Sequence, residues 1–178
     1  MTSSSPGGTP SLRPVESPGG SRAPVARIVG RQNVPACVRA LSSLPDADYA
    51  DMFTLSTAAD ATPEQWARAM FGDVPDAGER FIWRGLLGLR LSRGRSPETV
   101  AGWRIADRGE NSVRLEAGSW FLTGNLVVRA ADGRVSLATF VRYDRILGRL
   151  VWPPLSAIHR RLTPGVLRDA AAKVSRRR

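Results

Sequence analysis

One stretch constrains the fold of this chain more than any other, the segment Phe121–Asp144 with the sequence FLTGNLVVRAADGRVSLATFVRYD. Two runs rich in β-branched and aromatic residues flank Asp132-Gly133, a pair that supplies the positive φ angles of a two-residue type I′ turn. The pattern predicts a β-hairpin in which Ala131 lies opposite Arg134. In this register one face is almost wholly apolar, whereas a slip of one residue would bury charged side chains. The apolar pairs are Ala130 with Val135, Val128 with Leu137, Leu126 with Thr139, Gly124 with Val141 and Leu122 with Tyr143.

The same alternation extends upstream of the hairpin. Gly118-Ser119 can form a Gly-X turn that sets Ala117 opposite Trp120. A longer loop then leads back to a strand over Val100–Ala106. These segments together predict a four-stranded antiparallel meander. Its second face is polar apart from two phenylalanines, so we expect the sheet to be covered on one side.

Length and composition favour one domain. The chain has 178 residues, of which 42% are hydrophobic, and this is enough to bury a sizeable core. The single cysteine, Cys37, cannot form an internal disulfide or a thiolate metal cage, so we expect a reducing, cytoplasmic location.

The N-terminal stretch of the chain is rich in Ser, Pro and Gly and lacks the apolar run of a signal peptide or an anchor. We therefore expect a disordered tail and linker over residues 1–44. The folded domain is expected over residues 45–174, followed by a basic tail over residues 175–178.

Two further patterns precede the meander. Tyr49–Ser56 alternates loosely and predicts a first strand at a sheet edge. Thr62 can cap a helix that begins at Pro63, and Gln65 completes a capping box. A second helix is predicted over Asp76–Leu91 from the spacing of its apolar residues.

The C-terminal segment, residues 146–174, is helical in composition but contains Pro153-Pro154 and Pro164-Gly165. A proline inside a helix costs about 3 kcal/mol or more, so we expect separate helical pieces. Arg160 and Arg161 are expected to stay mostly exposed. The apolar stripe expected to lie on the sheet consists of Leu150, Val151, Leu155, Ile158, Leu162 and Val166.

Four motifs stand out in this order of elements: DYADMF at residues 48–53, GWRI at 102–105, LATFVRYDR at 137–145, and the segment from Trp152 to Arg160. Over about residues 48–172 the chain resembles a family of small actinobacterial proteins of unknown function in or near the START-like superfamily of polyketide cyclases and plant allergens. The resemblance implies a helix-grip fold, in which a curved sheet wraps a C-terminal helix and leaves a cavity. Four meander strands, where five or six are usual, imply a shallower cavity.

The sequence therefore predicts an α+β helix-grip domain. An antiparallel meander packs on a long, broken C-terminal helix, and two helices lie between the first strand and the meander. If a cavity exists, Gly124 is expected to leave side-chain volume there. The residues expected to line it are Trp103, Leu126, Thr139, Tyr143, Trp152 and His159.

These candidate residues also have structural explanations. His159 is the only histidine and can donate or accept a proton, but packing and surface histidines are common. The tryptophans can line a pocket or fill the core, and the hydroxyls of Thr139 and Tyr143 can bond a ligand or the backbone. No second ligand stands at metal-binding spacing from His159, so neither a metal site nor a cofactor is predicted.

The formal net charge of +10 is concentrated near the C-terminus, where residues 145–178 contain nine Lys or Arg and one acidic residue. Such a face can dock on an anionic membrane or an acidic partner, or it can simply be solvated. No nucleic-acid motif is present, so sequence-specific binding to nucleic acid is not expected. The arginines expected to take part in docking are Arg145, Arg149, Arg160, Arg161 and Arg168.

Three functions follow from these observations, in decreasing order of support. The first is binding of an apolar small molecule between the sheet and the C-terminal helix. The second is docking of the basic face on an anionic membrane or an acidic partner. The third is an enzyme of the cyclase or dehydratase kind with His159 or Tyr143 as proton-transfer group. It ranks lowest because the sequence reveals no acid/base pair.

Overall fold

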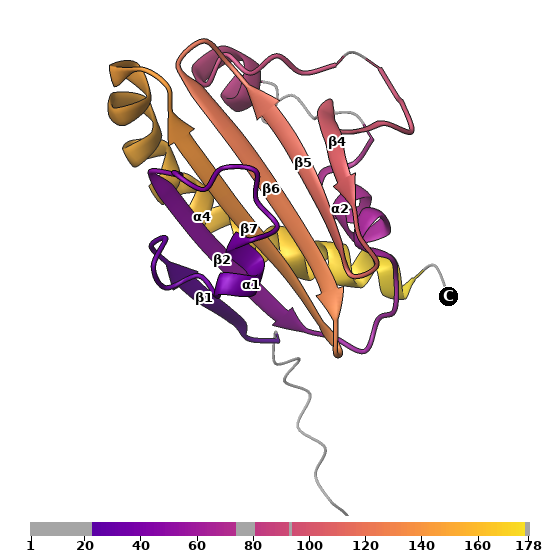
Figure 1. Cartoon of the computed structure of the whole chain (residues 1–178). Coiled ribbons are helices and arrows are strands. Elements are labelled where there is room, and N and C mark those ends of the chain that lie inside the picture. Colours follow the sequence, from indigo (N-terminus) through magenta and orange to yellow (C-terminus); the bar gives the residue numbers. More distant parts are fainter. Residues whose placement is uncertain (1–22, 74–80, 93, 177–178) are drawn as a thin grey trace, which may run out of the picture.

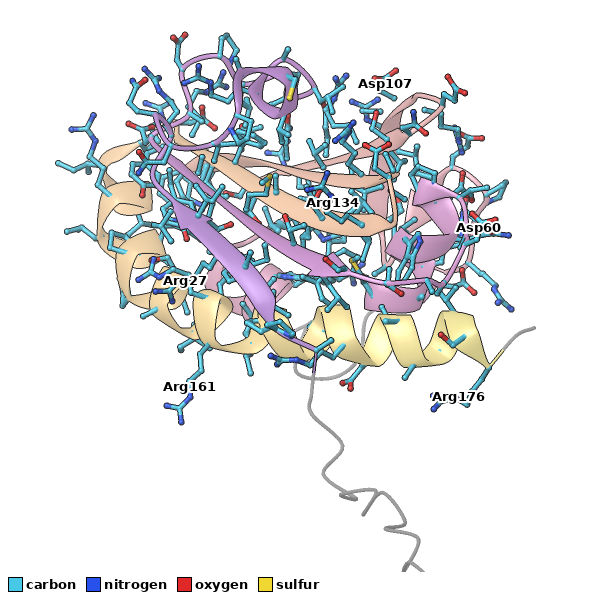
Figure 2. All side chains as sticks on the ribbon, turned by 90° about the horizontal axis from the view of Figure 1, so that it is seen from below. Arg27, Asp60, Asp107, Arg134, Arg161 and Arg176 are labelled. Carbon is cyan, nitrogen blue, oxygen red and sulfur yellow. The ribbon has the colours of Figure 1, made fainter. Side chains whose placement is uncertain are left out.

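The computed structural model describes residues 23–73, 81–92 and 94–176. In these ranges a single antiparallel sheet has seven strands in the order β1-β2-β7-β6-β5-β4-β3. It forms the middle layer, with α4 on one face, here called the inner face, and α1 on the outer face (Figure 1, Figure 2). The elements are β1 (Val25–Val29), α1 (Ala36–Arg39), β2 (Tyr49–Ser56), α2 (Pro63–Phe71), η1 (Phe81–Leu86), β3 (Thr99–Val100), β4 (Trp103–Arg108), β5 (Ser112–Gly118), β6 (Leu122–Ala131), β7 (Arg134–Tyr143) and α4 (Ile146–Ser175).

The hairpin of β6 and β7 confirms the predicted register. Ala131 lies opposite Arg134, and every apolar pair down to Leu122 with Tyr143 is formed. Asp132 and Gly133 have φ angles of 54° and 67°, as a type I′ turn requires. The predicted α+β class and the long C-terminal helix are also confirmed.

The predicted turn between β5 and β6 is wrong. Ala117 pairs with Gly124 rather than with Trp120, because the chain makes a wider loop after Gly118. Ser119 stabilises this loop: its N–H donates to the Leu122 carbonyl at 2.8 Å, and its hydroxyl oxygen accepts from the Leu122 N–H at 3.2 Å. The register differs from the predicted one by an even number of residues, so the apolar side chains keep the same face.

The first predicted strand of the meander is interrupted. Ala101 and Gly102 have φ angles of 48° and 83° and form a turn between β3 and β4. A Cβ on Gly102 would lie 2.8 Å from the Ser92 carbonyl oxygen, so glycine is required there. Trp103 and Ile105 are both buried in the core, as expected. The turn divides the predicted strand into β3 and β4, so this part of the sheet has five strands, β3 to β7, where four were predicted.

The folded region also begins earlier than the predicted boundary at residue 45. β1 pairs with β2 along its whole length, so β2 is an inner strand and not an edge. Val34, Val38 and Leu44 are buried against Phe140 on the outer face. The outer face is therefore covered as well, which explains the phenylalanine at an apparently polar position. At the other end, α4 extends to Ser175.

Of the two helices predicted before the meander, only the first has the expected form. α2 has the capping box: Thr62 Oγ1 accepts from the Gln65 N–H, and Gln65 Oε1 accepts from the Thr62 N–H. The second prediction is wrong after Leu86, where the short π-helix η1 ends and the chain continues without regular secondary structure, with Leu87, Leu89 and Leu91 buried. Residues 76–80 of this predicted helix lie outside the described residues.

The C-terminal helix is continuous and not broken. α4 has 30 residues and contains Pro153, Pro154 and Pro164. Figures 1 and 2 show that it bends instead, as prolines in a helix commonly cause. The prolines change the direction of the helix without ending it.

The buried stripe of α4 also differs from the predicted one. Ile158 and Leu162 are 49% and 55% exposed, whereas Ser156 and Thr163 are buried. Both hydroxyls are satisfied by the helix itself, because Ser156 donates to the Pro153 carbonyl at 2.7 Å and Thr163 donates to the His159 carbonyl at 2.8 Å. Hydrophobic periodicity does not detect such residues. The side chains that face the sheet and α2 are Trp152, Ser156, Thr163, Leu167, Ala170 and Val174.

Candidate functional pocket

A cavity of about 170 Å³ lies between the inner face of the sheet, α4 and η1. Its wall is mostly apolar, and its polar residues include Asn125 on β6, Thr139 on β7, and His159 and Thr163 on α4. Ile158 and Leu162 line it while remaining about half exposed, so they lie at its mouth. Further wall residues are Phe71, Trp83, Leu87, Leu137, Val141, Leu155 and Val166.

Five of the six residues predicted to line a cavity do so in the structure. They are Trp103, Leu126, Thr139, Trp152 and His159. Tyr143 lies elsewhere: its side chain packs beneath the first turns of α4, where a Cβ on Gly148 would lie 3.1 Å from the Tyr143 Cβ. Burial, and then the charge of Asp48, raises the pKa of Tyr143. Tyr143 therefore packs against the start of α4 and does not line the pocket.

Gly124 lines the pocket but does not leave the free volume that was expected. A Cβ built there would lie 3.3 Å from Cη2 of Trp103. The indole ring of Trp103 thus occupies the space above the glycine and stacks edge-on against Trp83, with 5.8 Å between ring centroids. The glycine is needed so that the indole can approach the strand closely.

A cluster of polar side chains, here called the polar group, joins three elements at the wall of the pocket. His159 on α4 places Nε2 3.1 Å from Thr139 Oγ1 on β7 and 3.3 Å from Asp51 Oδ2 on β2. Asp51 and Thr139 are a cross-strand pair, so the sheet register brings them together. Asp51 is fully buried, whereas 22% of the His159 side chain is exposed. The sheet therefore holds a carboxylate beneath an accessible imidazole.

Two further residues extend this group. The Tyr49 hydroxyl donates to Asp51 Oδ2 at 2.5 Å, and Arg160 contacts the Tyr49 oxygen at 3.3 Å and donates to Ser156 Oγ at 2.8 Å. Burial, together with the negative charge and the hydrogen bond of Asp51, raises the pKa of Tyr49. Tyr49 therefore stays protonated and remains a donor to the carboxylate.

Sequence reasoning missed Asp51 and Tyr49, although a signal was present. Tyr49, Asp51, Phe53 and Leu55 alternate along β2 and share its inward face, so an acidic residue stands in an apolar series. Once β2 is placed beside β7, this position must be buried. A carboxylate at such a position needs partners, because an isolated buried charge is very costly.

Aromatic rings enclose the imidazole. Trp152 lies tilted against His159, with 5.9 Å between centroids, and Phe53 approaches it edge-on at 6.2 Å. Tyr49 in turn meets Trp152 edge-on at 5.3 Å. These contacts restrict the ring and exclude water from the Asp51 side of it.

Several buried polar atoms near the pocket have no hydrogen-bond partner among the described residues. Among them are Asp51 Oδ1 and the indole Nε1 atoms of Trp103 and Trp152. An unsatisfied buried group costs roughly 1–3 kcal/mol. The inner face thus contains polar groups whose hydrogen bonding is incomplete.

The basic residues of the C-terminal region have different environments. Arg145, Arg149 and Arg161 are exposed, and Arg161 extends away from the sheet in Figure 2. Arg160 is partly buried in the polar group, so the prediction that it stays mostly exposed is wrong. Arg168 donates to the Ala23 carbonyl at 3.1 Å.

Two other kinds of site were sought over the described ranges. No helix there is long and apolar enough to cross a membrane. No cluster of three or more His, Cys, Asp or Glu residues in these ranges is arranged to hold a metal ion.

Comparisons with known proteins provide no assignment. No family model, curated protein or solved structure matches the chain. Its function has to be inferred from the pocket and from the surface of α4.

Proposed function

We propose that the domain binds an apolar small molecule in the pocket between the sheet and α4, in the manner of START-like helix-grip proteins. The observation that carries this proposal is the cavity of about 170 Å³ with a largely apolar wall and a polar group at one side. Small-molecule sites commonly combine apolar walls with a few polar groups that orient the ligand. The free energy of binding would come mainly from apolar surface removed from water.

Cavity size limits the ligand. An apolar cavity of about 150 Å³ accommodates benzene, so the enclosed portion of the ligand is of the order of one or two rings. A longer molecule would extend through the mouth beside Ile158 and Leu162. The hydroxyl of Thr139 and the imidazole of His159 favour a ligand with one polar atom, such as a carbonyl or hydroxyl oxygen.

Thermal melting with a panel of apolar ring compounds and lipids tests this function. A ligand at about a hundred times its dissociation constant stabilises the protein by roughly 2.7 kcal/mol. Val166→Trp and Leu155→Trp each place a larger ring in the wall and should abolish the shift in melting temperature. Val29→Trp is the matched control, because Val29 is exposed on the outermost strand β1 and should leave the shift unchanged.

Two results contradict the proposal. One is a panel in which no compound stabilises the wild-type protein. The other is a shift that persists in both pocket variants, because such a ligand must bind elsewhere.

A second function is favoured by the surface of α4. Ile146 and Leu150 are 78% and 68% exposed, and Arg145 and Arg149 beside them are exposed too. The segment 145–162 contains no acidic residue. Apolar side chains that insert into a bilayer next to arginines that meet anionic headgroups are typical of helices on a membrane surface. We propose such docking as the alternative role.

Vesicle sedimentation distinguishes this role from ligand binding. The wild-type protein should sediment with vesicles of phosphatidylcholine and phosphatidylserine, less so as salt increases, and not with phosphatidylcholine alone. The double variant Ile146→Ser, Leu150→Ser should lose this binding, whereas the control Val29→Ser should retain it. Equal sedimentation of both variants would exclude α4 as the docking surface.

A further inference from the structure

We propose that the pocket is a proton-transfer site, in which His159 removes a proton from the carbon next to the carbonyl group of a bound apolar ketone. Asp51 and Thr139, which both contact the other ring nitrogen, are the positioning residues for the imidazole. This inference rests on the proposed binding of an apolar molecule in the same pocket.

The geometry excludes a different role for the same residues. In a nucleophile–histidine–carboxylate triad, the hydroxyl and the carboxylate contact different ring nitrogens. Here Thr139 and Asp51 both contact Nε2 of His159. Thr139 is therefore not activated as a nucleophile, and the arrangement is a pair of an imidazole and a carboxylate with a hydroxyl beside it.

Charge decides where the imidazole protons lie. The buried Asp51 already accepts a hydrogen bond from Tyr49, and its remaining neighbour in the group is the Nε2 atom of His159. The carboxylate favours a proton on Nε2, which leaves Nδ1 as the basic atom. Nδ1 has no hydrogen-bond partner among the described residues, while the side chain as a whole keeps 22% of its surface exposed. The base is thus oriented by a buried anion and remains accessible.

Thr139 holds the ring nitrogen that carries the proton. When Nε2 is protonated, Thr139 Oγ1 can accept from it at 3.1 Å, so the hydroxyl lies on the edge of the ring opposite the basic Nδ1. Thr139 therefore helps to orient the imidazole and does not contact a carbonyl group whose neighbouring carbon lies at Nδ1.

The step conserves atoms and electrons. The carbon–hydrogen bond breaks and its proton forms a bond with Nδ1. The electron pair moves through the carbon–carbon bond to the carbonyl oxygen and forms the enolate. The imidazolium, stabilised by Asp51, then returns a proton to the carbon or to the oxygen. No oxidant, metal or cofactor is needed, and the net result is proton exchange or keto–enol isomerisation.

The surroundings support a charged intermediate in an apolar pocket. The aromatic rings of Trp152 and Phe53 limit the access of water to the pair, and electrostatic stabilisation is stronger where water is excluded. The Tyr49 hydroxyl holds the Asp51 carboxylate, and Arg160 contacts the Tyr49 oxygen, so neither of them competes for Nδ1.

The first test uses 2-tetralone, an apolar two-ring ketone, with the full chain. Binding is measured by thermal melting, and exchange of the protons next to the carbonyl is measured by ¹H NMR in D₂O. The wild-type protein should exchange these protons at least ~100-fold faster than the same concentration of imidazole, since general base catalysis contributes roughly 10²–10⁴-fold. His159→Gln should lose the acceleration and still bind the ketone.

Asp51 is tested by a matched pair of substitutions. Asp51→Asn should lower the exchange rate at least ~10-fold, whereas Asp169→Asn makes the same chemical change at an exposed position on α4 and should have no effect. Because His159 is the only histidine in the chain, ¹⁵N NMR at high pH reports its tautomer directly. The wild-type ring should carry its proton on Nε2, and Asp51→Asn should remove this preference.

The outcomes separate the two proposals. Binding of 2-tetralone with exchange no faster than imidazole overturns the proton-transfer site and leaves the binding function standing. Absence of both binding and exchange also overturns the inference, and the binding function is then judged by the wider ligand panel. A wild-type ring protonated on Nδ1 overturns the assignment of the base even if exchange is observed.

Discussion

The two faces of the sheet are covered in different ways. On the outer face a short segment that includes α1 packs small apolar residues closely against Val127, Ala138 and Phe140. The buried Asn125 there accepts hydrogen bonds from the Ser42 hydroxyl, the Ser43 hydroxyl and the Ser43 N–H at 2.8–3.0 Å. On the inner face a long helix leaves a cavity, and the buried Asp51 keeps one oxygen without a partner among the described residues.

The difference follows from the shape of the covering element. A loop with a single helical turn can follow a twisted sheet and bring three donors to Asn125 Oδ1, although Asn125 Nδ2 keeps no partner among the described residues. A helix of 30 residues cannot follow the twist along its whole length, even with the bend at its prolines. The space that it leaves over the sheet is the candidate site. We therefore expect the closely packed outer face to serve stability alone, whereas the inner face holds the larger core and also carries the function.

The largest loss of stability is expected from removal of the residues that cover the outer face. A chain that starts at residue 45 lacks β1 as well as Val34, Val38 and Leu44. Complete burial of each such side chain stabilises by about 1.5–3 kcal/mol, and their sum is comparable to the roughly 5–15 kcal/mol of a whole domain. Circular dichroism in denaturant should therefore show no cooperative unfolding. A chain that starts at residue 23 is the control, and a truncated chain as stable as this control would contradict the assigned role.

Phe140→Ala is expected to have the next largest effect. The ring is 1% exposed at the centre of the outer cluster, so its loss should lower the free energy of unfolding by about 3–5 kcal/mol. Ligand-induced shifts in melting temperature should persist, because Phe140 does not line the pocket between the sheet and α4. If Phe140→Ala instead lost ligand binding and kept the wild-type free energy of unfolding, the roles assigned to the two faces would be contradicted.

Gly124→Leu should have an intermediate effect on the inner face. Its Cβ would already be tight against Trp103, so a larger side chain must displace the indole, and overpacking costs about 1–3 kcal/mol. Gly165→Leu is the control, because no atom lies within 4 Å of a Cβ there. The control should gain up to ~1 kcal/mol from helix propensity. Equal free energies of unfolding for the two variants would show that the Trp103 indole can be displaced without loss of stability.

The smallest effect is expected for Ile158→Ala. A complete core position would cost roughly 2–5 kcal/mol, but this side chain is 49% exposed at the mouth of the pocket, so the loss should stay below about 1 kcal/mol. Leu167→Ala on the same helix is fully buried and should show the larger loss. Similar losses for both would mean that Ile158 packs more deeply than the structure places it.

Much of the sheet could be predicted because local rules determine it. Asp132-Gly133 fixes both the turn type and the register of β6 and β7, and alternation assigns each side chain to a face. Five of the six expected pocket residues follow from this assignment and from the position of the C-terminal segment. The capping box of α2 is similarly local.

Other features could not be predicted because they depend on contacts between distant segments. Ser119 widens a turn that its dipeptide alone would make tight. Residues 23–44 show no periodic pattern that predicts an element, yet they fold because a sheet face with Phe140 is available to cover. Ser156 and Thr163 are buried because the helix satisfies their hydroxyls.

The sequence by itself determined the antiparallel hairpin, the α+β class and the apolar wall of a pocket, because side-chain period and turn chemistry act over a few residues. Only the tertiary structure decided that Asp51, Thr139 and His159 meet, since β2, β7 and α4 are separate elements that only the fold brings together. A buried carboxylate acquires its role from partners that other elements supply, and no local pattern of residues specifies those partners.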